Sequence, residues 1–397
     1  MAEDREKLYQ ERLTRYTTAM KNGKPDRIPL RIFAAEFANT YAGITNQEAL
    51  FDYEKAFAAV RKCATDFQWD SVMTNMVAVW AGLVNQLGLV YYRFPGVELP
   101  VEMGHQYVEP PDEEGAYMHA DEYDLLIESP TEYLANIWIP RVAKPMSKFG
   151  DATTFESNMT WLKAGIGMVM YDNAWGSANL ALRHECGCVP AIAGILKAPF
   201  DILADKLRGF RQVCVDVYRQ PEKVEKACEA LMPHLVQNAL FTSDPEKNLP
   251  VTVWLHRGTY FSDAMYERFF WPTFKEIIEE LWRHGLQTLW YGEGNWNRWL
   301  KHTAQLPEHS IIYHVDQEDI FEAHKALGEK FCISGGIPND LLAFGTPEKV
   351  RSYCKKVIDG VAKDGGYIMD ASAIIQSDAK VENMKAMTEF TLEYGAY

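Results

Sequence analysis

Glu293 and His314 are the residues of this sequence whose types and positions most favour metal chemistry. Glu293 lies near the end of the β-prone stretch QTLWYGEG (287–294), between two glycines, and His314 lies in the apolar stretch SIIYHVD (310–316). Zinc binds carboxylate oxygen and imidazole nitrogen, and glycines beside a ligand leave room for the metal and a substrate. The pair therefore indicates a zinc site in which Glu293 and His314 are the catalytic ligands.

The same two residues also have a purely structural interpretation. Glu293 could form an ion pair with Arg257 or Arg298, and His314 could be a core histidine whose hydrogen bonds are satisfied. The residue types alone leave these alternatives open.

A third zinc ligand is expected at the end of another strand, where Asp370 and His256 are the candidates. Either residue could instead contact the metal's ligands or the substrate. The segment HECGC (184–188) also holds ligand types, but no second cysteine pair accompanies it as structural zinc sites require. We therefore expect its cysteines to be buried.

Eight short β-prone stretches alternate with helical patterns along the chain. The stretches are 27–35, 70–76, 189–200, 250–258, 287–294, 310–316, 331–337 and 365–371. Helices are expected over 221–240, 270–285 and 346–365, each with a proline in its first turns. Strands alternating with helices predict a parallel sheet, and eight repeats predict an α/β fold of the (β/α)8 TIM-barrel type. An open, doubly wound sheet is the alternative.

In a TIM barrel the active site lies at the C-terminal ends of the strands, where the βα loops meet. Several polar and aromatic residues fall at or after these predicted ends. We expect the substrate to be bound by His256, Tyr291, Asn75, Glu36 and Trp80.

The chain is expected to form one domain over residues 1–397, with a helix over about 1–26. Residues of about 90–180 break the alternation and predict a long insertion after strand two, lying over the barrel mouth. Between Val108 and Glu132 the insertion holds acids but no Lys or Arg, so for that part alone a solvated loop is the favoured interpretation.

Composition excludes several classes of function. The net charge of −15 argues against nucleic-acid binding, which needs clustered Lys and Arg. No apolar run is long enough to span a membrane, and the charged N-terminus has no signal-peptide pattern. Seven cysteines in a chain of this length indicate reduced thiols and a cytoplasmic protein.

Four segments of the sequence resemble the uroporphyrinogen decarboxylase superfamily. They are PDRIPLRIF (25–33), AGILKAPFD (193–201), ISGGIPNDLLAFGTPEKV (333–350) and GGYIMDASAIIQSDAKVENM (365–384). Decarboxylases of this family carry an Arg-Gln-x-x-Arg motif after strand one, which binds propionates. Here RIFAAEFANT (31–40) has no second Arg, and His256 stands where the decarboxylases have an aspartate after strand four.

With these departures, the chain resembles the corrinoid-dependent methyltransferase branch of the superfamily more than its decarboxylases. Its thiol-alkylating members bind zinc through His-x-Cys, for which this chain has Tyr291 and Glu293. Loss of the thiolates makes zinc a harder Lewis acid, suited to an ether oxygen. The interval from Glu293 to His314 resembles that in the first methyltransferase of anaerobic aryl O-demethylase systems, but that family's earlier glutamate is not matched at Ile278.

The resemblance implies methyl transfer from a methoxylated aromatic compound to the Co(I) corrinoid (cobalamin) of a separate corrinoid protein, with Zn²⁺ held by Glu293, His314 and Asp370. Two alternatives stay open: another methyl donor such as a methylamine, methylthiol or betaine, and a non-catalytic tetrapyrrole- or corrinoid-binding barrel. The sequence does not fix the oligomeric state, and a homodimer is one arrangement open to it.

Overall fold

A ring of short parallel strands forms the centre of the protein. The computed structural model describes residues 2–74, 82–85, 87–143, 145–146 and 154–397. The ring strands are β1 (Arg31–Ile32), β2 (Ser71–Val72), β5 (Val189–Pro190), β6 (Ile195–Lys197), β7 (Val251–Leu255), β8 (Thr288–Gly292), β9 (Ile311–Val315), β10 (Cys332–Gly335) and β11 (Tyr367–Ile368). Each falls inside one of the eight predicted stretches.

Backbone pairing joins the strands in chain order. One ladder runs β1-β2-β5 and another runs from β6 to β11, all parallel. The ladders are interrupted at two places. β5 and β6 are successive parts of the third predicted strand, and β11 meets β1 through the bridge between Leu30 and Met369. Because the order never reverses, as it would in a doubly wound sheet, the predicted TIM barrel is confirmed.

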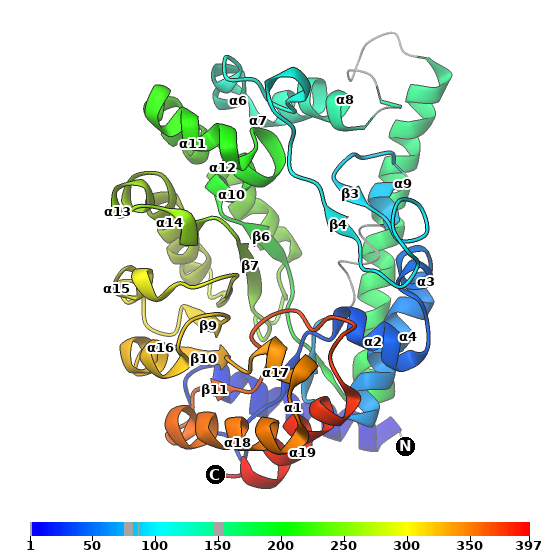
Figure 1. Ribbon diagram of the computed structural model, residues 1–397, viewed down its shortest axis with the longest axis vertical. Helices are drawn as coiled ribbons and strands as arrows, with labels where there is room; N and C mark the ends of the chain where they lie inside the picture. Colours follow the sequence, from blue (N-terminus) through cyan, green and yellow to red (C-terminus); the bar gives the residue numbers. More distant parts are fainter. Residues whose placement is uncertain (1, 75–81, 86, 144, 147–153) are drawn as a thin grey trace.

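Helices surround the ring (Figure 1). They are α1 (Ala2–Met20), α2 (Ala35–Ala42), α3 (Asn46–Phe51), α4 (Tyr53–Asp66), α10 (Pro199–Ile202), α11 (Phe210–Arg219), α12 (Pro221–Thr242), α13 (Asp263–Met265), α14 (Trp271–Arg283), α15 (Leu300–Thr303), α16 (Ile320–Leu327), α17 (Asn339–Phe344), α18 (Pro347–Val357) and α19 (Val381–Tyr394). The three helices expected from the sequence correspond to α12, α14 and α18. Thr346 caps α18 by accepting a hydrogen bond from Lys349 N, with Pro347 in the first turn.

The described part of the segment between β2 and β5 contains strands and helices joined by exposed loops. It contains β3 (Tyr92–Arg93), β4 (Gln106–Tyr107), α6 (Tyr123–Glu128), α7 (Pro130–Tyr133), α8 (Ile139–Val142) and α9 (Phe155–Ala181). Its acids pair with bases elsewhere: Glu113 with Arg208 at 2.6 Å and Asp124 with Lys223 at 2.7 Å. The acidic stretch nevertheless stays largely exposed, with the Glu113 and Asp124 side chains 56% and 71% exposed, as the solvated-loop interpretation expects.

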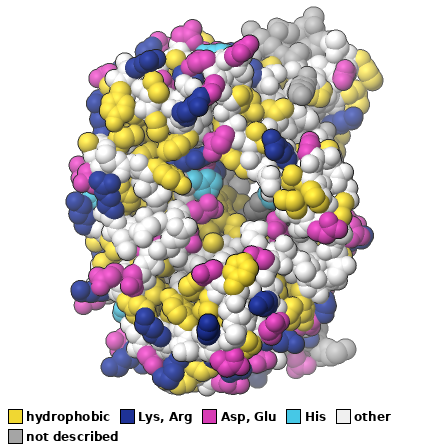
Figure 2. Space-filling view, in the orientation of Figure 1, with side chains coloured by type: hydrophobic (Ala, Val, Ile, Leu, Met, Phe, Trp, Pro, Cys, Tyr) yellow, Lys and Arg dark blue, Asp and Glu magenta, His cyan; other side chains and the backbone are white. Residues whose placement is uncertain are grey.

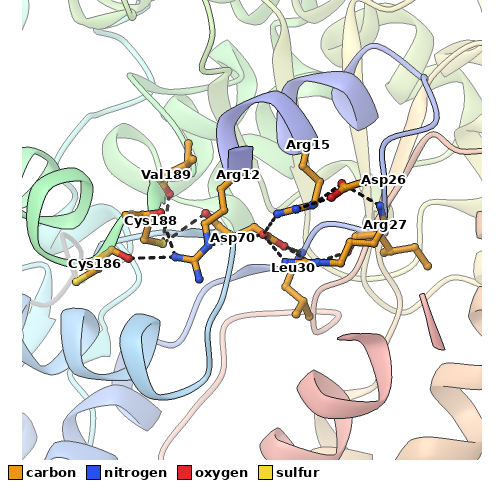
Figure 3. Close-up of polar contacts among 11 residues, drawn as sticks. Arg12, Arg15, Asp26, Arg27, Leu30, Asp70, Cys186, Cys188 and Val189 are labelled. Carbon is orange, nitrogen blue, oxygen red and sulfur yellow. Dashed lines mark hydrogen bonds and ion pairs between the residues drawn. The ribbon is translucent and has the colours of Figure 1, made fainter. Parts of the chain in front are cut away.

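The N-terminal ends of the first strands are closed by α1 (Figure 3). Asp70, which precedes β2, is fully buried and accepts hydrogen bonds from Arg15 at 2.6 Å and from both terminal nitrogens of Arg27 at 2.8 Å. Arg12 lies 3.8 Å away and also donates to the carbonyls of Cys186 and Gly187. The cysteines of HECGC thus lie in this structural region, as expected, and both are buried. Within the described residues, no helix is long and apolar enough to cross a membrane.

Candidate active site at the barrel mouth

Aromatic rings form the floor of the barrel mouth. Tyr291, at the end of β8, stacks on the ring of His314 with centroids 4.3 Å apart and planes 10° apart. The rings of Trp254 and Phe33 pack against Tyr291, with centroids 4.6 and 6.5 Å from that of Tyr291. Burial raises the pKa of Tyr291 well above its usual value, so the phenol is neutral. Tyr291 is only 1% exposed, which gives it little surface for the predicted contact with substrate.

His314 belongs to a buried network below this floor. Arg31 Nη2 lies 2.8 Å from His314 Nδ1, and Arg31 also donates to Asp370 Oδ2 at 2.9 and 3.1 Å. A guanidinium has only donors, so Nδ1 accepts and the ring proton is on Nε2, which donates to the carbonyl of Ser372 at 3.0 Å. Burial and the charge of Arg31 hold the pKa of His314 well below its usual value. Both nitrogens of the neutral ring are therefore engaged.

The predicted trio of zinc ligands is not brought together. His314 has no free lone pair and Asp370 is paired with Arg31, whereas the Glu293 side chain is 48% exposed and faces His256 instead. Among the described residues, no three His, Cys, Asp or Glu side chains are placed to hold a metal ion. The donor set therefore does not fit zinc, and the structural interpretation of His314 as a satisfied core histidine agrees with its contacts.

Gly292, the last residue of β8 before Glu293, does not have the predicted role of leaving room for a metal. A Cβ at Gly292 would lie 2.6 Å from Trp296 Nε1, so this glycine makes room for a tryptophan and not for a metal. Trp296 is fully buried and donates to the carbonyl of Glu293 at 3.0 Å. The Glu293 carboxylate lies 3.8 Å from His256 Nε2. The suggested partners Arg257 and Arg298 pair with other acids.

Asp205 organises the cations on this side of the mouth. It lies in the π-helical turn η4 (Leu203–Leu207) that follows strand three. Its carboxylate contacts Lys197 Nζ and His256 Nδ1, each at 2.7 Å, and Arg257 Nε at 2.6 Å. Burial alone would raise the pKa of Asp205, but the hydrogen bond with His256 and the three neighbouring cationic groups lower it overall. His256 is thereby held with Nε2 directed at Glu293.

Other acids near the mouth have no cation partner. Within the described part of the chain, Asp201, Asp316 and Glu318 form no ion pair. Burial, with the charge of Asp205 second, raises the pKa of Asp201 to about 6. Burial likewise raises the pKa of Asp316 to about 6 and of Glu318 to about 7. These carboxyl groups can hold or release a proton close to neutral pH.

A cavity of about 160 Å³ adjoins the floor on the opposite side. Its lining comes from β1 and α2, from the segment before β4 and from the loop after β11, and includes Phe33, Glu36, His105 and Gln376. Burial lowers the pKa of His105 to about 4, so its imidazole is neutral at pH 7, and burial raises the pKa of Glu36. Figure 2 shows this face of the molecule hollowed near its centre, with histidine and acidic side chains at the rim.

The predicted substrate-binding residues have different outcomes. Glu36 lines the cavity and His256 lies at the mouth, whereas Tyr291 is covered. Asn75 and Trp80 lie outside the described residues. Sequence reasoning missed Lys197, Asp205 and His105. The signal for the first two was present in KAPFDILAD (197–205), where a lysine ends a strand and two acids follow four residues apart. His105 in the insertion carried no such signal.

Comparisons with known proteins agree with this architecture. The family described as "Uroporphyrinogen decarboxylase (URO-D)" matches residues 174–394, more than half of the chain. No curated protein matches. Among solved structures, a methyltransferase from Methanosarcina mazei is similar with a TM-score of 0.62 at 14% identity, over 96% of this chain and 98% of that one. That likeness shows a shared fold, and the family match shows the lineage: the chain belongs to the uroporphyrinogen decarboxylase family.

Proposed function

We propose that the protein is a corrinoid-dependent methyltransferase. Its methyl donor would be a methoxylated aromatic compound with one ring, and its acceptor the Co(I) corrinoid of a separate corrinoid protein. The proposal rests on the family, on a fold shared with a methyltransferase, and on the use that the barrel makes of its arginines.

The observation that carries the proposal concerns the arginines of strand one. A decarboxylase of this family is expected to bind propionates with arginines that follow this strand. Here Arg31 is fully buried and paired with Asp370, and Arg27 is paired with Asp70 at the other end of the barrel. Neither guanidinium is available to a carboxylate substrate, which disfavours decarboxylation of a tetrapyrrole and supports the methyltransferase branch.

The size of the cavity supports a small donor. A cavity of about 150 Å³ can hold benzene, and the cavity beside Glu36 measures about 160 Å³. A tetrapyrrole is several times larger than this space. A single methoxylated ring matches its volume, and Phe33 offers an aromatic wall.

The residues of this chain would bind the donor and stabilise the leaving oxygen. The corrinoid supplies the electron pair that accepts the methyl group, so the chain need not provide a nucleophile. When the methyl–oxygen bond breaks, the oxygen keeps the bonding pair and needs a hydrogen-bond or proton donor. The neutral imidazole of His105 can donate an N–H, and the raised pKa of Glu36 makes it a second candidate proton donor.

The proposal does not include a role for zinc, because the His, Cys, Asp and Glu side chains that the structure describes do not form a site for it. Glu293 and His256 face one another and would supply two ligands at most. If zinc does bind, His256→Ala should release it and His314→Ala should not, since both nitrogens of His314 are engaged. Stoichiometric zinc that is lost from a folded His314→Ala variant would restore the ligands predicted from the sequence.

The direct test is anaerobic mixing of the purified protein with cob(I)alamin and a panel of methyl donors. We expect methoxyphenols to be demethylated, measured as the loss of the Co(I) spectrum together with release of the phenol. Transfer from trimethylamine, methanethiol or betaine alone would favour the other donors of the branch. Cobalamin binding with no transfer from any donor would overturn the proposal in favour of a binding protein.

Gly104→Ala tests the cavity without removing a polar group. A Cβ at this position would lie 1.7 Å from Glu36 Oε1 and must displace that carboxylate. Displacement of a positioning group by about 1 Å can lower activity by as much as ~100-fold, so we expect kcat/KM for the aryl ether to fall. Gly165→Ala is the matched control, because its Cβ meets no atom within 4 Å. Equal activity of both variants would place the donor elsewhere.

A further inference from the structure

The cavity beside Glu36 offers no positive charge to a ligand. Among the described residues that line it, Glu36 is the single acid, and there is no lysine or arginine. His105 is the one lining group that can become a cation, but burial lowers its pKa to about 4, so it is neutral at pH 7. An anion that enters this cavity therefore finds no opposite charge in the described lining.

The surroundings of Glu36 are also acidic. Burial raises the pKa of Glu36, and the negative charge of Asp378 raises it further, against a hydrogen bond from the backbone of Ser377. No described lysine or arginine forms an ion pair with Glu36. The first turn of α2 favours a negative charge, but Glu36 lies in that turn and supplies it. The net charge of −15 adds to this negative potential.

The other polar side chains of the lining are neutral amides. Asn39 donates to Asn46 Oδ1 at 2.9 Å, and Asn46 donates to the carbonyl of Glu102 at 2.7 Å. The third amide, Gln376, is exposed to solvent. Because removing a carboxylate from water is costly unless it is paired with a cation or fully hydrogen-bonded, these groups do not compensate a substrate carboxylate placed beside Glu36.

A phenolic hydroxyl fits Glu36 in both of its protonation states. A hydroxyl both donates and accepts, so it can donate to the carboxylate of Glu36 or accept from its protonated form. An ionised benzoate only accepts, so it can bind there only if Glu36 takes up a proton or if two like charges are brought together. Near neutral pH a phenol, with a pKa of about 10, is uncharged, whereas a carboxylic acid, with a pKa of about 4, is ionised.

We propose that Glu36 makes the cavity selective for uncharged methoxyphenols and excludes methoxylated benzoates. The inference deepens the proposed function and rests on it for the choice of an aryl methyl ether as the ligand. Glu36 is then a specificity-determining residue, because its carboxyl group selects among the donors of one reaction.

Three ligands separate charge from size. They are guaiacol (ortho-methoxyphenol), vanillate, which adds a carboxylate para to the hydroxyl, and vanillamide, which has a neutral amide in place of that carboxylate. Ligand-observed NMR titrations of the full chain without corrinoid measure each Kd in the absence of turnover. We expect guaiacol and vanillamide to bind, and vanillate to bind at least ~10-fold more weakly than vanillamide, because the juxtaposition of like charges is strongly unfavourable.

Removal of the negative charge should abolish this discrimination. Glu36→Gln keeps an oxygen that can accept from the Ser377 N–H, and it should bring the Kd of vanillate close to that of vanillamide. Asp378→Asn should act in the same direction with a smaller effect, because Asp378 is exposed. Glu322→Gln is the matched control: it removes one negative charge from α16, where the side chain is 62% exposed, and should leave each Kd unchanged. Thermal unfolding checks that each variant is folded.

Transfer assays with cob(I)alamin and the same ligands distinguish this inference from the proposed function. Equal binding of vanillate and vanillamide to the wild type would overturn the inference, even if both were demethylated. Rejection of vanillamide together with vanillate would also overturn it, since size and not charge would then decide. A preference for vanillamide that Glu36→Gln leaves intact would assign the selection to another residue and reject the role of Glu36. The expected preference without any methyl transfer would support the selective cavity and contradict the methyltransferase.

Discussion

Two buried aspartates at opposite ends of the barrel are both surrounded by cations, but their surroundings differ. Asp70, at the N-terminal ends of the strands, is fully buried among Arg12, Arg15 and Arg27, and none of these side chains is more than 18% exposed. Asp205, at the mouth, contacts Lys197, His256 and Arg257, of which His256 is 30% exposed. One cluster is closed, and the other opens to solvent.

The difference separates a structural cluster from a functional one. Around Asp70 every ion-pair partner among the described residues is an arginine, which stays charged and makes rigid, forked contacts. Around Asp205 the partners include a lysine and a histidine, and nearby acids without cations have pKa values raised to about 6 or 7. The closed end relies on arginines, whose charge is permanent, while the open end includes carboxyl groups whose pKa values burial raises toward neutral pH.

The closed cluster should show the largest effect on stability. Asp70→Asn removes the buried carboxylate that Arg12, Arg15 and Arg27 share and leaves their charge buried, which typically costs about 3–5 kcal/mol. We expect urea unfolding to show a loss of this size. Asp26→Asn is the control, because Asp26 pairs with the same Arg15 but its side chain is 65% exposed, so about 1 kcal/mol or less is expected. Similar losses in both variants would contradict a special role for Asp70.

The open cluster should respond in activity more than in stability. Asp205→Asn leaves cations that water can reach, so we expect a loss of only about 1–3 kcal/mol. Asp205 orients His256, the substrate contact predicted at the mouth, so we expect methyl transfer to fall roughly 10- to 100-fold, as for other residues that position a functional side chain. Glu109→Gln, which removes an exposed partner of Arg257, is the matched control and should change neither property measurably. An Asp205→Asn variant with unchanged kcat/KM would remove this cluster from the site.

Features of the fold that depend on local sequence patterns could be predicted, and features that depend on distant contacts could not. Each barrel strand is a short apolar run with turn residues after it, and this local pattern places all eight. The start of a helix such as α18 is predicted by its N-cap residue Thr346 and by Pro347 in its first turn. The insertion was harder to interpret, because its acids are satisfied by cations more than ninety residues away, such as Arg208 for Glu113. Ion pairs over such separations leave no local signal.

The candidate site was predicted only in part for a related reason. Position at a strand end was correctly inferred for His256 and Glu293, but the direction of a side chain depends on its neighbours. His314 occupies β9 and points into the barrel, where Gly335 leaves room for it: a Cβ there would lie 2.6 Å from His314 Cε1. Spacing between Glu293 and His314 could not reveal that Arg31, from the far end of the sequence, engages the imidazole.

Glu318 gives the test with the smallest expected effect, a pH-dependent change in stability that separates the mouth from the closed end of the barrel. It is buried, accepts hydrogen bonds from Tyr313 OH at 2.8 Å and Asp316 N at 3.0 Å, and has a pKa raised to about 7 by burial. A carboxyl that binds its proton more tightly in the folded state destabilises the protein as pH rises from about 4.5 to about 7. Glutamine keeps the shape: its amide oxygen can accept from Asp316 N, and its amide nitrogen can donate to the Tyr313 oxygen, which reverses the direction of that hydrogen bond.

Glu318→Gln should therefore match the wild type at pH 5 and exceed it by about 1–2 kcal/mol at pH 8, since one pKa unit corresponds to about 1.4 kcal/mol and the amide hydrogen bonds are weaker than those of a carboxylate. Thermal unfolding at the two pH values measures the difference. Glu113→Gln should behave in the opposite sense, because Arg208 lowers the pKa of Glu113 and its contribution is greatest above the unfolded-state pKa. If Glu318→Gln instead lost stability equally at both pH values, the contribution of Glu318 would not depend on its protonation, and the mouth would lack the titratable character that distinguishes it from the closed end.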